Sequence, residues 1–330
     1  MVQNNVEQEG VPEGVFVAWH PYSRRGQLLS KKFGLRLHLI HALERRYLLA
    51  PIRYALQAMT TFKILGREKP RLVFVQNPPI FAVMVVYIYT RLRKARYIVD
   101  SHTGGLLAPW WKWSLPIHAF LSRRAITTIV TNAHLKALVD SWGADSFVIG
   151  DIPTTFPLGR AFSMNGKFNI AVVNTFSPDE PLEEVLEAAA TLPEVHFYVT
   201  GDLIRAKKSL LRNKPDNVEF TGFLPDEDYF GLLRAVQAIM VLTTDDHTMQ
   251  RGACEAVSLG KPIITSDWPI LREHFDKGTI YVDNCARTIR EAVIEMQEAR
   301  ERLEGEVAIL RQQRWQEWQH KHAALTERLH

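Results

Sequence analysis

Hydrophobic and polar positions along the chain fall into two patterns that alternate repeatedly. Short continuous runs of apolar residues, each followed by polar or glycine residues, are typical of buried strands in a parallel sheet. The stretches between them carry apolar residues at helical spacing. This alternation predicts an α/β protein made of two βα-rich halves. The expected strands are Val15–Trp19, Leu72–Val75, Tyr97–Asp100, Thr127–Thr131, Phe168–Val173, His196–Thr200, Ala238–Leu242, Ile263–Thr265 and Tyr281–Asp283.

The segment Asp151–Pro157 separates the two halves, because it contains two prolines and shows no periodicity. The end of the chain reads as a long helical tail with a break near Gly305. Trp315 and Trp318 lie three residues apart there and predict an apolar docking face. The expected organisation is a disordered lead over 1–14, a first domain over 15–157, a second domain over 158–305 and a helix over 306–330 that returns to the first domain.

Composition indicates an ordinary soluble globular protein, with 46% hydrophobic and 23% charged residues. Cys254 and Cys285 form neither a disulfide framework nor a metal-binding spacing, which favours a cytoplasmic location. The polar and acidic start, Met1–Gly14, does not resemble a signal peptide. The longest apolar run, Pro78–Thr90, is too short to span a bilayer.

Charge is distributed unevenly between the halves. Residues up to Leu158 contain 20 Lys and Arg against 9 Asp and Glu, whereas the rest contains 20 against 27. A basic first half favours an anionic partner, such as a phosphorylated acceptor, an anionic membrane face on the inner side of the membrane, or nucleic acid. The helix expected over Phe81–Ile88, with basic residues after it, is either a core helix or a membrane-facing element.

The most informative stretch of the second half is Thr243–Asp267. It reads as the end of a buried strand, a polar loop, a helix that stops at Gly260, and a further strand. A helix that begins so soon after a strand directs its backbone N–H groups toward the carboxyl edge of the sheet, where a phosphate is commonly bound. Glu255 lies in the first turns of this helix, where its carboxylate can accept hydrogen bonds from the hydroxyls of a ribose.

This stretch resembles the nucleotide-sugar segment of retaining glycosyltransferases of family four, which have the GT-B fold. His247 stands where the family has its first glutamate, and Asp245 or Asp246 could substitute for it. The second part of the family pattern is carried by Glu255-Ala256, Gly260, Pro262, Ile263-Ile264 and Thr265.

The resemblance implies two Rossmann-like domains facing a cleft, and transfer of a hexose from a nucleotide-diphosphate sugar with retention of configuration. It implies neither a metal nor a cofactor beyond that GDP- or UDP-linked substrate. The catalytic candidates are His102, His247 and Asp246. The donor-binding candidates are Thr175, Ser177, Gly201, Gly222, Phe223, Leu224, Thr248, Met249, Gln250, Arg251 and Glu255, with Glu255 on the ribose and Gly222–Leu224 at the nucleobase.

Relatives of the fold carry an arginine and a lysine in the loop that here is Asn174–Pro181, and neither is present. Thr175 and Ser177 could offer hydroxyl and backbone N–H groups instead. Arg251 and Lys261 are the candidate cations for the diphosphate.

In the first half, His102 follows a strand and precedes the glycine pair Gly104-Gly105, so it is expected at the carboxyl tip of the sheet. Family members carry a histidine in the corresponding loop, near the transferred sugar; the alternative is a purely local hydrogen bond. The expected acceptor residues are Ser23, Arg24 and Arg25 after the first strand, and the tryptophans Trp110, Trp111 and Trp113.

The function expected from these features is glycosyl transfer, with a lean toward mannose, to a lipid-linked or membrane-associated glycan. The alternative is a non-catalytic nucleotide-binding relative or a partner subunit. A dinucleotide-dependent oxidoreductase is disfavoured because no G-x-G-x-x-G follows the strands at Val15 or Phe168. No nucleic-acid-binding module is recognisable.

Overall fold

A computed structural model describes residues 14–43, 49–165 and 168–329. The chain divides into two compact units between Ile152 and Pro153. Unit 1 contains the residues up to Ile152 together with those from His320 onward, and unit 2 contains Pro153–Gln319. The predicted disordered lead lies outside the described residues, except for Gly14, which begins the first strand.

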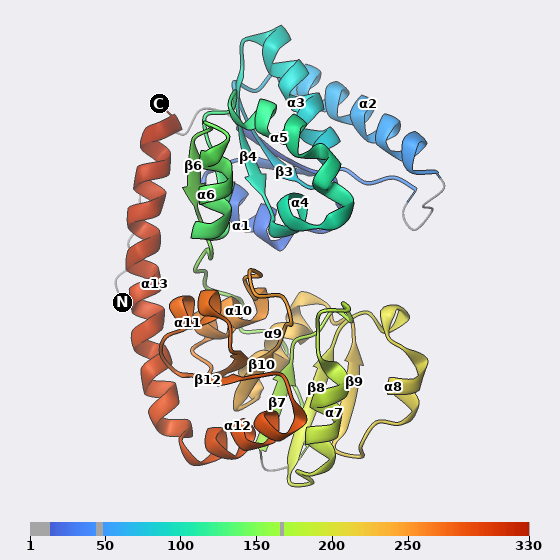
Figure 1. Ribbon diagram of the computed structural model, residues 1–330, viewed down its shortest axis with the longest axis vertical. Helices are drawn as coiled ribbons and strands as arrows, with labels where there is room; N and C mark the ends of the chain where they lie inside the picture. Colours follow the sequence, from blue (N-terminus) through green and yellow to red (C-terminus); the bar gives the residue numbers. More distant parts are fainter. Residues whose placement is uncertain (1–13, 44–48, 166–167, 330) are drawn as a thin grey trace. The chain divides into compact units, whose positions relative to one another are not determined.

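Unit 1 is built on a six-stranded parallel sheet with the order β2-β1-β3-β4-β5-β6. Figure 1 shows β3, β4 and β6 of this sheet among the helices of the unit. The central strands are apolar because helices cover both faces. Strand β2 is not among the predicted strands, since this half-exposed edge strand lacks a long apolar run. The strands are β1 (Gly14–Ala18), β2 (Arg36–Leu39), β3 (Leu72–Asn77), β4 (Arg96–Ser101), β5 (Thr128–Val130) and β6 (Ser146–Val148).

The helices of unit 1 pack on both faces of this sheet. Val15, Val73 and Val99 point toward α2 and α3 on one face, whereas Phe74 contacts Phe33 at the end of α1 on the other. Helix α3 buries the apolar residues of its first three turns in the core, whereas Ile88 and Leu92 near its end are exposed. The helices are α1 (Arg24–Lys32), α2 (Ala50–Glu68), α3 (Ile80–Arg93), α4 (Thr103–Leu107), η2 (Pro109–Ser114), α5 (Leu115–Ser122) and α6 (Ala133–Ser141).

Unit 2 repeats the architecture with a second six-stranded parallel sheet of order β12-β11-β10-β7-β8-β9. Its strands are β7 (Phe168–Val172), β8 (Val195–Thr200), β9 (Val218–Gly222), β10 (Ala238–Val241), β11 (Ile263–Ser266) and β12 (Thr279–Val282). Its other elements are α7 (Leu182–Ala190), η3 (Leu203–Arg205), α8 (Lys208–Arg212), α9 (Asp226–Ala235), α10 (Arg251–Leu259), α11 (Pro269–His274), α12 (Ala286–Glu298) and α13 (Arg300–Leu329).

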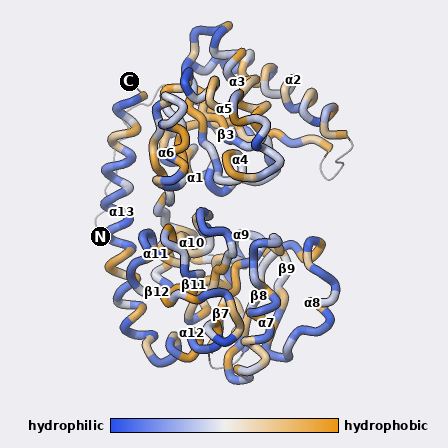
Figure 2. Tube along the Cα trace, viewed as in Figure 1, coloured by the Kyte–Doolittle hydropathy of each residue, from blue (hydrophilic) through white to orange (hydrophobic). Residues whose placement is uncertain are grey.

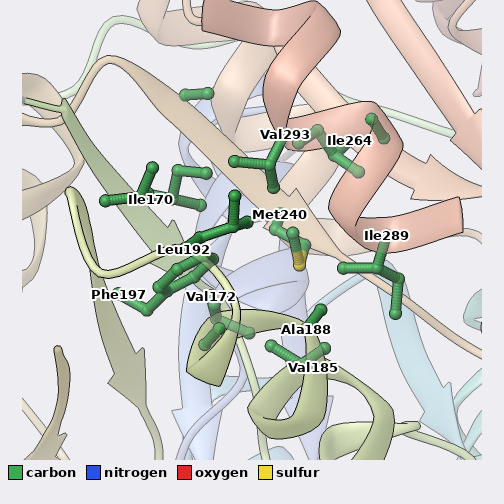
Figure 3. Packing of buried hydrophobic residues seen from close by; sticks show 14 of the residues in the cluster. Ile170, Val172, Val185, Ala188, Leu192, Phe197, Met240, Ile264, Ile289 and Val293 are labelled. Atoms are coloured by element: carbon green, nitrogen blue, oxygen red, sulfur yellow. The ribbon is translucent and has the colours of Figure 1, made fainter. Parts of the chain in front are cut away.

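The core of unit 2 has two layers, one on each face of the sheet. Figure 3 shows one layer, in which Val172 and Met240 of the sheet pack with Val185 of α7 and Val293 of α12. The other layer packs the opposite side chains of the same strands against α9, α10 and α11. Hydrophobic residues accordingly concentrate along the central strands of each unit (Figure 2). Together the two units confirm the predicted α/β fold with two Rossmann-like domains.

The strand order places a topological switch point in each unit. In unit 1 the strand after β1 is added on one side of the sheet, whereas the strands after β3 are added on the other side. In unit 2 the strands after β7 are added on one side of the sheet, and the strands after β10 are added on the other side. The loops that follow the two central strands therefore diverge at the carboxyl edge, which is where open α/β sheets bind ligands.

Helix α13 is continuous through Gly305, so the break predicted there is wrong. The break lies at Ala299, where α12 ends and α13 begins. The predicted return to the first domain is confirmed, because the residues from His320 belong to unit 1. There His322 stacks on Phe33 with ring centroids 4.6 Å apart. Within the described residues, no helix is both long and apolar enough to cross a membrane.

Candidate functional site

The switch point of unit 2 is formed by the loops after β7 and β10. Asp179 ties these loops together, because its carboxylate accepts a hydrogen bond from Thr243 Oγ1 at 2.8 Å and its carbonyl accepts one from Thr244 N at 2.7 Å. Gly252 lets the start of α10 approach the sheet, since a Cβ there would lie 2.8 Å from Val173. The first turn of α10 is thereby held against the ends of β7 and β10.

Glu255 is 95% buried in the middle of α10. Its carboxylate accepts a hydrogen bond of 2.6 Å from the hydroxyl of Tyr229, which lies on α9. A buried carboxylate fixed on one side by a tyrosine can accept further hydrogen bonds from ligand hydroxyls. Gln250 precedes the helix, and its side chain makes no capping hydrogen bond with the described residues.

The loop after β7 is closed on itself by carboxylates. Glu180 accepts hydrogen bonds from Thr175 N at 2.8 Å, from Thr175 Oγ1 at 3.0 Å and from Ser177 N at 2.9 Å. The hydroxyl of Ser177 donates to Asp179. Burial raises the pKa of Glu180, against the opposing effect of these hydrogen bonds. The groups predicted to bind the diphosphate are therefore engaged by this chain's own carboxylates.

The loop before α10 carries the residues that replace the family's first glutamate. Asp245 and Asp246 are exposed, and His247 Nε2 lies 3.6 Å from Asp246 Oδ1. Burial raises the pKa of Asp245, and the neighbouring carboxylates of Asp179 and Asp246 raise it further. Thr248 and Met249 are half-buried and lead into the helix.

Gly222 is the last residue of β9, at the edge of the same sheet, and Phe223 and Leu224 follow it. Phe223 is largely exposed there, as expected for a contact with a planar base. Three strand spacings separate β9 from β10, which is about 14 Å and close to the length of an extended nucleoside diphosphate. Gly201, at φ +127°, lies between them and packs against the loop after β7, because a Cβ there would meet Asn174 O at 2.5 Å.

The structure separates the two cations predicted for the diphosphate. Arg251 is the first residue of α10, at the carboxyl edge. Lys261 follows the other end of the helix and donates a 2.7 Å hydrogen bond to Val236 O. Because α10 returns the chain to the start of β11, Lys261 lies at the amino edge, and its assignment to the diphosphate is wrong.

The switch point of unit 1 contains a pocket of about 230 Å³. Gln57 is 96% buried in its wall; its amide nitrogen donates to Ile40 O, whereas its Oε1 accepts no hydrogen bond from the described residues. Such a pocket suits a ring with an apolar face and hydroxyl groups, for example a sugar. It is lined by Trp19, His20, Pro21, His41, Ala42, Arg53, Tyr54, Gln57, Pro78, Pro79 and Trp111.

At the end of the neighbouring strand β4, a buried ion pair lies next to the imidazole of His102. Arg25 Nε lies 2.9 Å from Asp100 Oδ1, and the other carboxylate oxygen lies 3.4 Å from His102 Nε2. Burial alone would raise the pKa of Asp100, but Arg25 and His102 lower it to about 2. Asp100 is thus an anion at neutral pH and orients the imidazole, which is 34% exposed at the tip of the sheet.

A second buried network fixes the end of β4. The imidazole of His118 lies between Ser101 Oγ at 3.1 Å and Ser122 Oγ at 3.0 Å, and Asn77 Nδ2 donates to Ser101. Burial lowers the pKa of His118 to about 4, so the ring is neutral at pH 7. This network positions the backbone from which His102 projects.

The remaining predicted acceptor residues have different surroundings. Ser23 is buried, accepts from Gly26 N at the start of α1 and donates to Gln76. Arg24 lies over the ring of Tyr22. Trp111 lines the pocket, whereas Trp110 and Trp113 are exposed.

Sequence reasoning missed several residues that hold these sites. Asp100 was recognisable as a charged residue at the end of a buried strand, two positions before His102. Tyr229, Asp179 and Gln57 lie in ordinary helical or loop patterns, so no sequence signal identifies them.

Part of the chain is similar to a known protein family. Residues 167–299 match the model of the family described as "Glycosyl transferases group 1". The match covers the sheet of unit 2 and both halves of its switch point.

Two curated relatives are similar over a larger part of the chain. Both are named chitobiosyldiphosphodolichol beta-mannosyltransferase. The human protein is 25% identical over 249 residues, covering 68% of this chain and 49% of its own length. The protein of Pongo abelii is 24% identical over 247 residues, covering 68% and 48%. This chain therefore spans about half the length of these relatives.

Solved structures share the fold. A sucrose-phosphate synthase from Thermosynechococcus elongatus superposes with a TM-score of 0.63 at 14% identity, covering 94% of this chain and 89% of its own. HepE of Anabaena, in complex with UDP and glucose, gives 0.63 at 14% identity, covering 96% and 100%. These similarities establish the GT-B fold for this chain.

The ion pair behind His102 gives a first prediction. Arg25→Met leaves the buried Asp100 without its guanidinium, and we expect the free energy of unfolding of unit 1 to fall by about 3–5 kcal/mol at pH 7. Arg24→Met, the matched control on a half-buried neighbour, should change it by less than about 0.5 kcal/mol. Urea unfolding followed by circular dichroism measures both.

Acid should remove this difference. The folded pKa of Asp100 is below that of an ordinary carboxyl group, so its stabilisation is present above about pH 4 and disappears as the pH falls toward about 2. Equal stability of Arg25→Met and Arg24→Met at pH 7 would contradict a role for the ion pair.

Proposed function

We propose that this chain is a glycosyltransferase that transfers mannose from a GDP-linked donor to a lipid-linked glycan. The observation that carries the proposal is Glu255, a buried and tyrosine-fixed carboxylate at the switch point of the segment that matches glycosyl transferases group 1. The names of the two curated relatives support mannose and a diphosphate-linked lipid as the acceptor class.

In this proposal the donor lies along the carboxyl edge of the unit 2 sheet. The ribose hydroxyls donate to Glu255, and the base contacts Gly222–Leu224. The diphosphate lies at the first turn of α10, where backbone N–H groups and Arg251 stabilise its negative charge without a metal or a cofactor. The backbone N–H groups of Thr175 and Ser177, which donate hydrogen bonds to Glu180, become available to the diphosphate only if Glu180 moves.

The acceptor in this proposal lies at the carboxyl edge of unit 1. The aromatic pocket takes a sugar ring, and Gln57 Oε1 accepts a hydrogen bond from one of its hydroxyls. His102 serves as the base: Asp100 faces its Nε2, which leaves Nδ1 to accept the proton of the attacking hydroxyl. The hydroxyl oxygen bonds to the anomeric carbon as the bond to the diphosphate breaks, and the diphosphate leaves with the electron pair.

The stereochemical course is part of the proposal. The family resemblance implies retention, whereas the relatives' name specifies a β-mannosyl linkage, which an α-linked donor yields only by inversion. We favour inversion for this chain, because the Asp100–His102 pair supplies the base that a direct displacement needs.

Nucleotide binding gives the second prediction. GDP at 100 times its dissociation constant should stabilise the protein by about 2.7 kcal/mol and raise Tm by about 5–10 °C, as measured by differential scanning fluorimetry. Glu255→Gln should weaken GDP binding at least about tenfold and so reduce the shift to about half or less at the same GDP concentration, and Tyr229→Phe should weaken binding by up to about tenfold. Glu187→Gln, an exposed carboxylate on α7, is the matched control and should retain it.

If neither GDP, UDP nor ADP shifts Tm, the donor site is refuted. If another nucleotide binds in place of GDP with the same dependence on Glu255, the site stands and the choice of GDP is wrong.

The transfer reaction gives the third prediction. With GDP-mannose and chitobiosyl-diphospho-polyprenol in detergent, we expect a β-linked product by NMR and no loss of activity in EDTA. His102→Ala should lower kcat by about a hundredfold or more. Trp111→Ala should raise KM for the acceptor about tenfold with KM for the donor unchanged, whereas Trp110→Ala should raise neither.

An α-linked product would refute the inverting course and restore retention. A requirement for Mg²⁺ or Mn²⁺ would contradict the proposed metal independence.

A second candidate function is a non-catalytic nucleotide-binding relative or partner subunit. The closed loop after β7 favours it, because Thr175 and Ser177 already donate to Glu180 and Asp179. Nucleotide binding that depends on Glu255, without any transfer in the assay above, would select this function.

A further inference from the structure

Helix α2 carries apolar residues on its buried face and also on its exposed face. Its inward residues include Gln57 and Thr61, of which Gln57 donates to Ile40 O at 3.0 Å and Thr61 accepts from Trp19 Nε1 at 2.9 Å. Surface helices of globular proteins normally direct their apolar stripe into the core. Here the inward face combines these hydrogen bonds with the packing of Leu65 and other apolar side chains against the core.

A second group of apolar residues on α2 points outward. Ile52, Leu56 and Met59 lie at the i, i+4 and i+7 positions of one face and are 53%, 37% and 61% exposed. We call these three residues the α2 stripe. Eight of the nine large hydrophobic side chains exposed in the described part of unit 1 lie between Ile52 and Phe120. A concentration of this kind marks an interaction surface.

A tryptophan extends the same surface. Tyr54 lies on α2 between Ile52 and Leu56. Its ring contacts that of Phe81 with centroids 4.7 Å apart, and the ring of Phe81 contacts that of Trp113 with centroids 6.0 Å apart. Trp113 is 55% exposed, and its indole can lie with its apolar body in an interface and its N–H toward water.

The surroundings are strongly basic. Residues 49–124 contain 12 Lys and Arg but only two acidic residues. Both acidic residues are already neutralised, Asp100 by the buried Arg25 and Glu68 by Arg36 at 2.9 Å. Helices α2 and α3 each lead into a strand of the parallel sheet, so both end at its amino edge. Exposed cations occur in the last two turns of these helices or directly after them: Lys63, Arg67, Arg91, Arg93 and Lys94.

We propose that the α2 stripe and Trp113 dock on the surface of an anionic lipid bilayer, with the basic helix ends against the headgroups. Apolar side chains that enter the interface combined with cations that remain in the headgroup layer match the chemistry of such a surface. A second copy of the chain is a poorer partner, because two such basic faces would repel each other. This inference does not rest on the proposed transfer reaction, since lipid binding requires neither donor nor acceptor.

Vesicle flotation tests the proposal on the full chain. We compare vesicles of neutral phosphatidylcholine with vesicles containing about one-third phosphatidylglycerol, at about 0.1 M salt. The wild type should float with the anionic vesicles only, and raising the salt should weaken binding. Leu56→Glu combined with Met59→Glu should lower the partition coefficient at least about tenfold. Ile204→Glu, at an apolar residue of unit 2 that is 76% exposed, is the control and should bind like the wild type.

Circular dichroism and Tm establish whether the variants are folded. If the double glutamate variant is unfolded, the double variant Leu56→Asn with Met59→Asn takes its place, and its partition coefficient should also be at least about tenfold lower than that of the wild type. Failure of the wild type to float with anionic vesicles would overturn the proposal, as would equal flotation of wild type and folded stripe variant. Dimerisation in sedimentation velocity that depends on the stripe, without vesicle binding, would also overturn it and assign the surface to a second copy.

Discussion

The reversal of strand order within each parallel sheet is the constraint on which both candidate sites depend. Where the chain leaves β7 to one side and β10 to the other, no connection covers the carboxyl ends between them. The crevice in unit 2 is then shaped by close packing of α10 through Gly252 and by the hydrogen bonds of Asp179. In unit 1 the same reversal between β1 and β3 leaves the aromatic pocket. Both sites thus follow from topology, and side chains decide what they bind.

Charge is used differently at the two sheet edges. In unit 1 a buried guanidinium lowers the pKa of Asp100 to about 2, so that a fixed anion stands behind an accessible imidazole. In unit 2 burial raises the pKa of Glu180 and of Asp245, and neighbouring carboxylates add to both shifts. An anionic diphosphate entering this second region meets negative charge that only the helix dipole, Arg251 or a change in Glu180 can offset. In the proposed function, this electrostatic balance decides whether the chain transfers a sugar or only binds a nucleotide.

The sequence predicted the features that local pattern encodes. Apolar runs located the central strands, and the positions of His102 and Glu255 after or near strand ends placed them at the carboxyl edges. Contacts between residues distant in sequence could not be predicted in this way: Arg25 with Asp100, and Tyr229 with Glu255, are brought together only by packing. Lys261 was misassigned because its distance along the chain from Glu255 is short, whereas α10 carries it to the opposite edge. The outward apolar stripe of α2 was missed because apolar residues lie on both faces of this helix, so periodicity alone does not show which of them the core receives.

The central claim is that Glu255 binds the ribose of a nucleoside diphosphate, and titration calorimetry with a matched pair of ligands tests it most directly. GDP and its 2′,3′-dideoxy analogue share base and diphosphate and differ only in the ribose hydroxyls. The account predicts that the wild type binds GDP at least about tenfold more tightly than the analogue, and that Glu255→Gln binds the two equally. Equal affinity of the wild type for both ligands would contradict it.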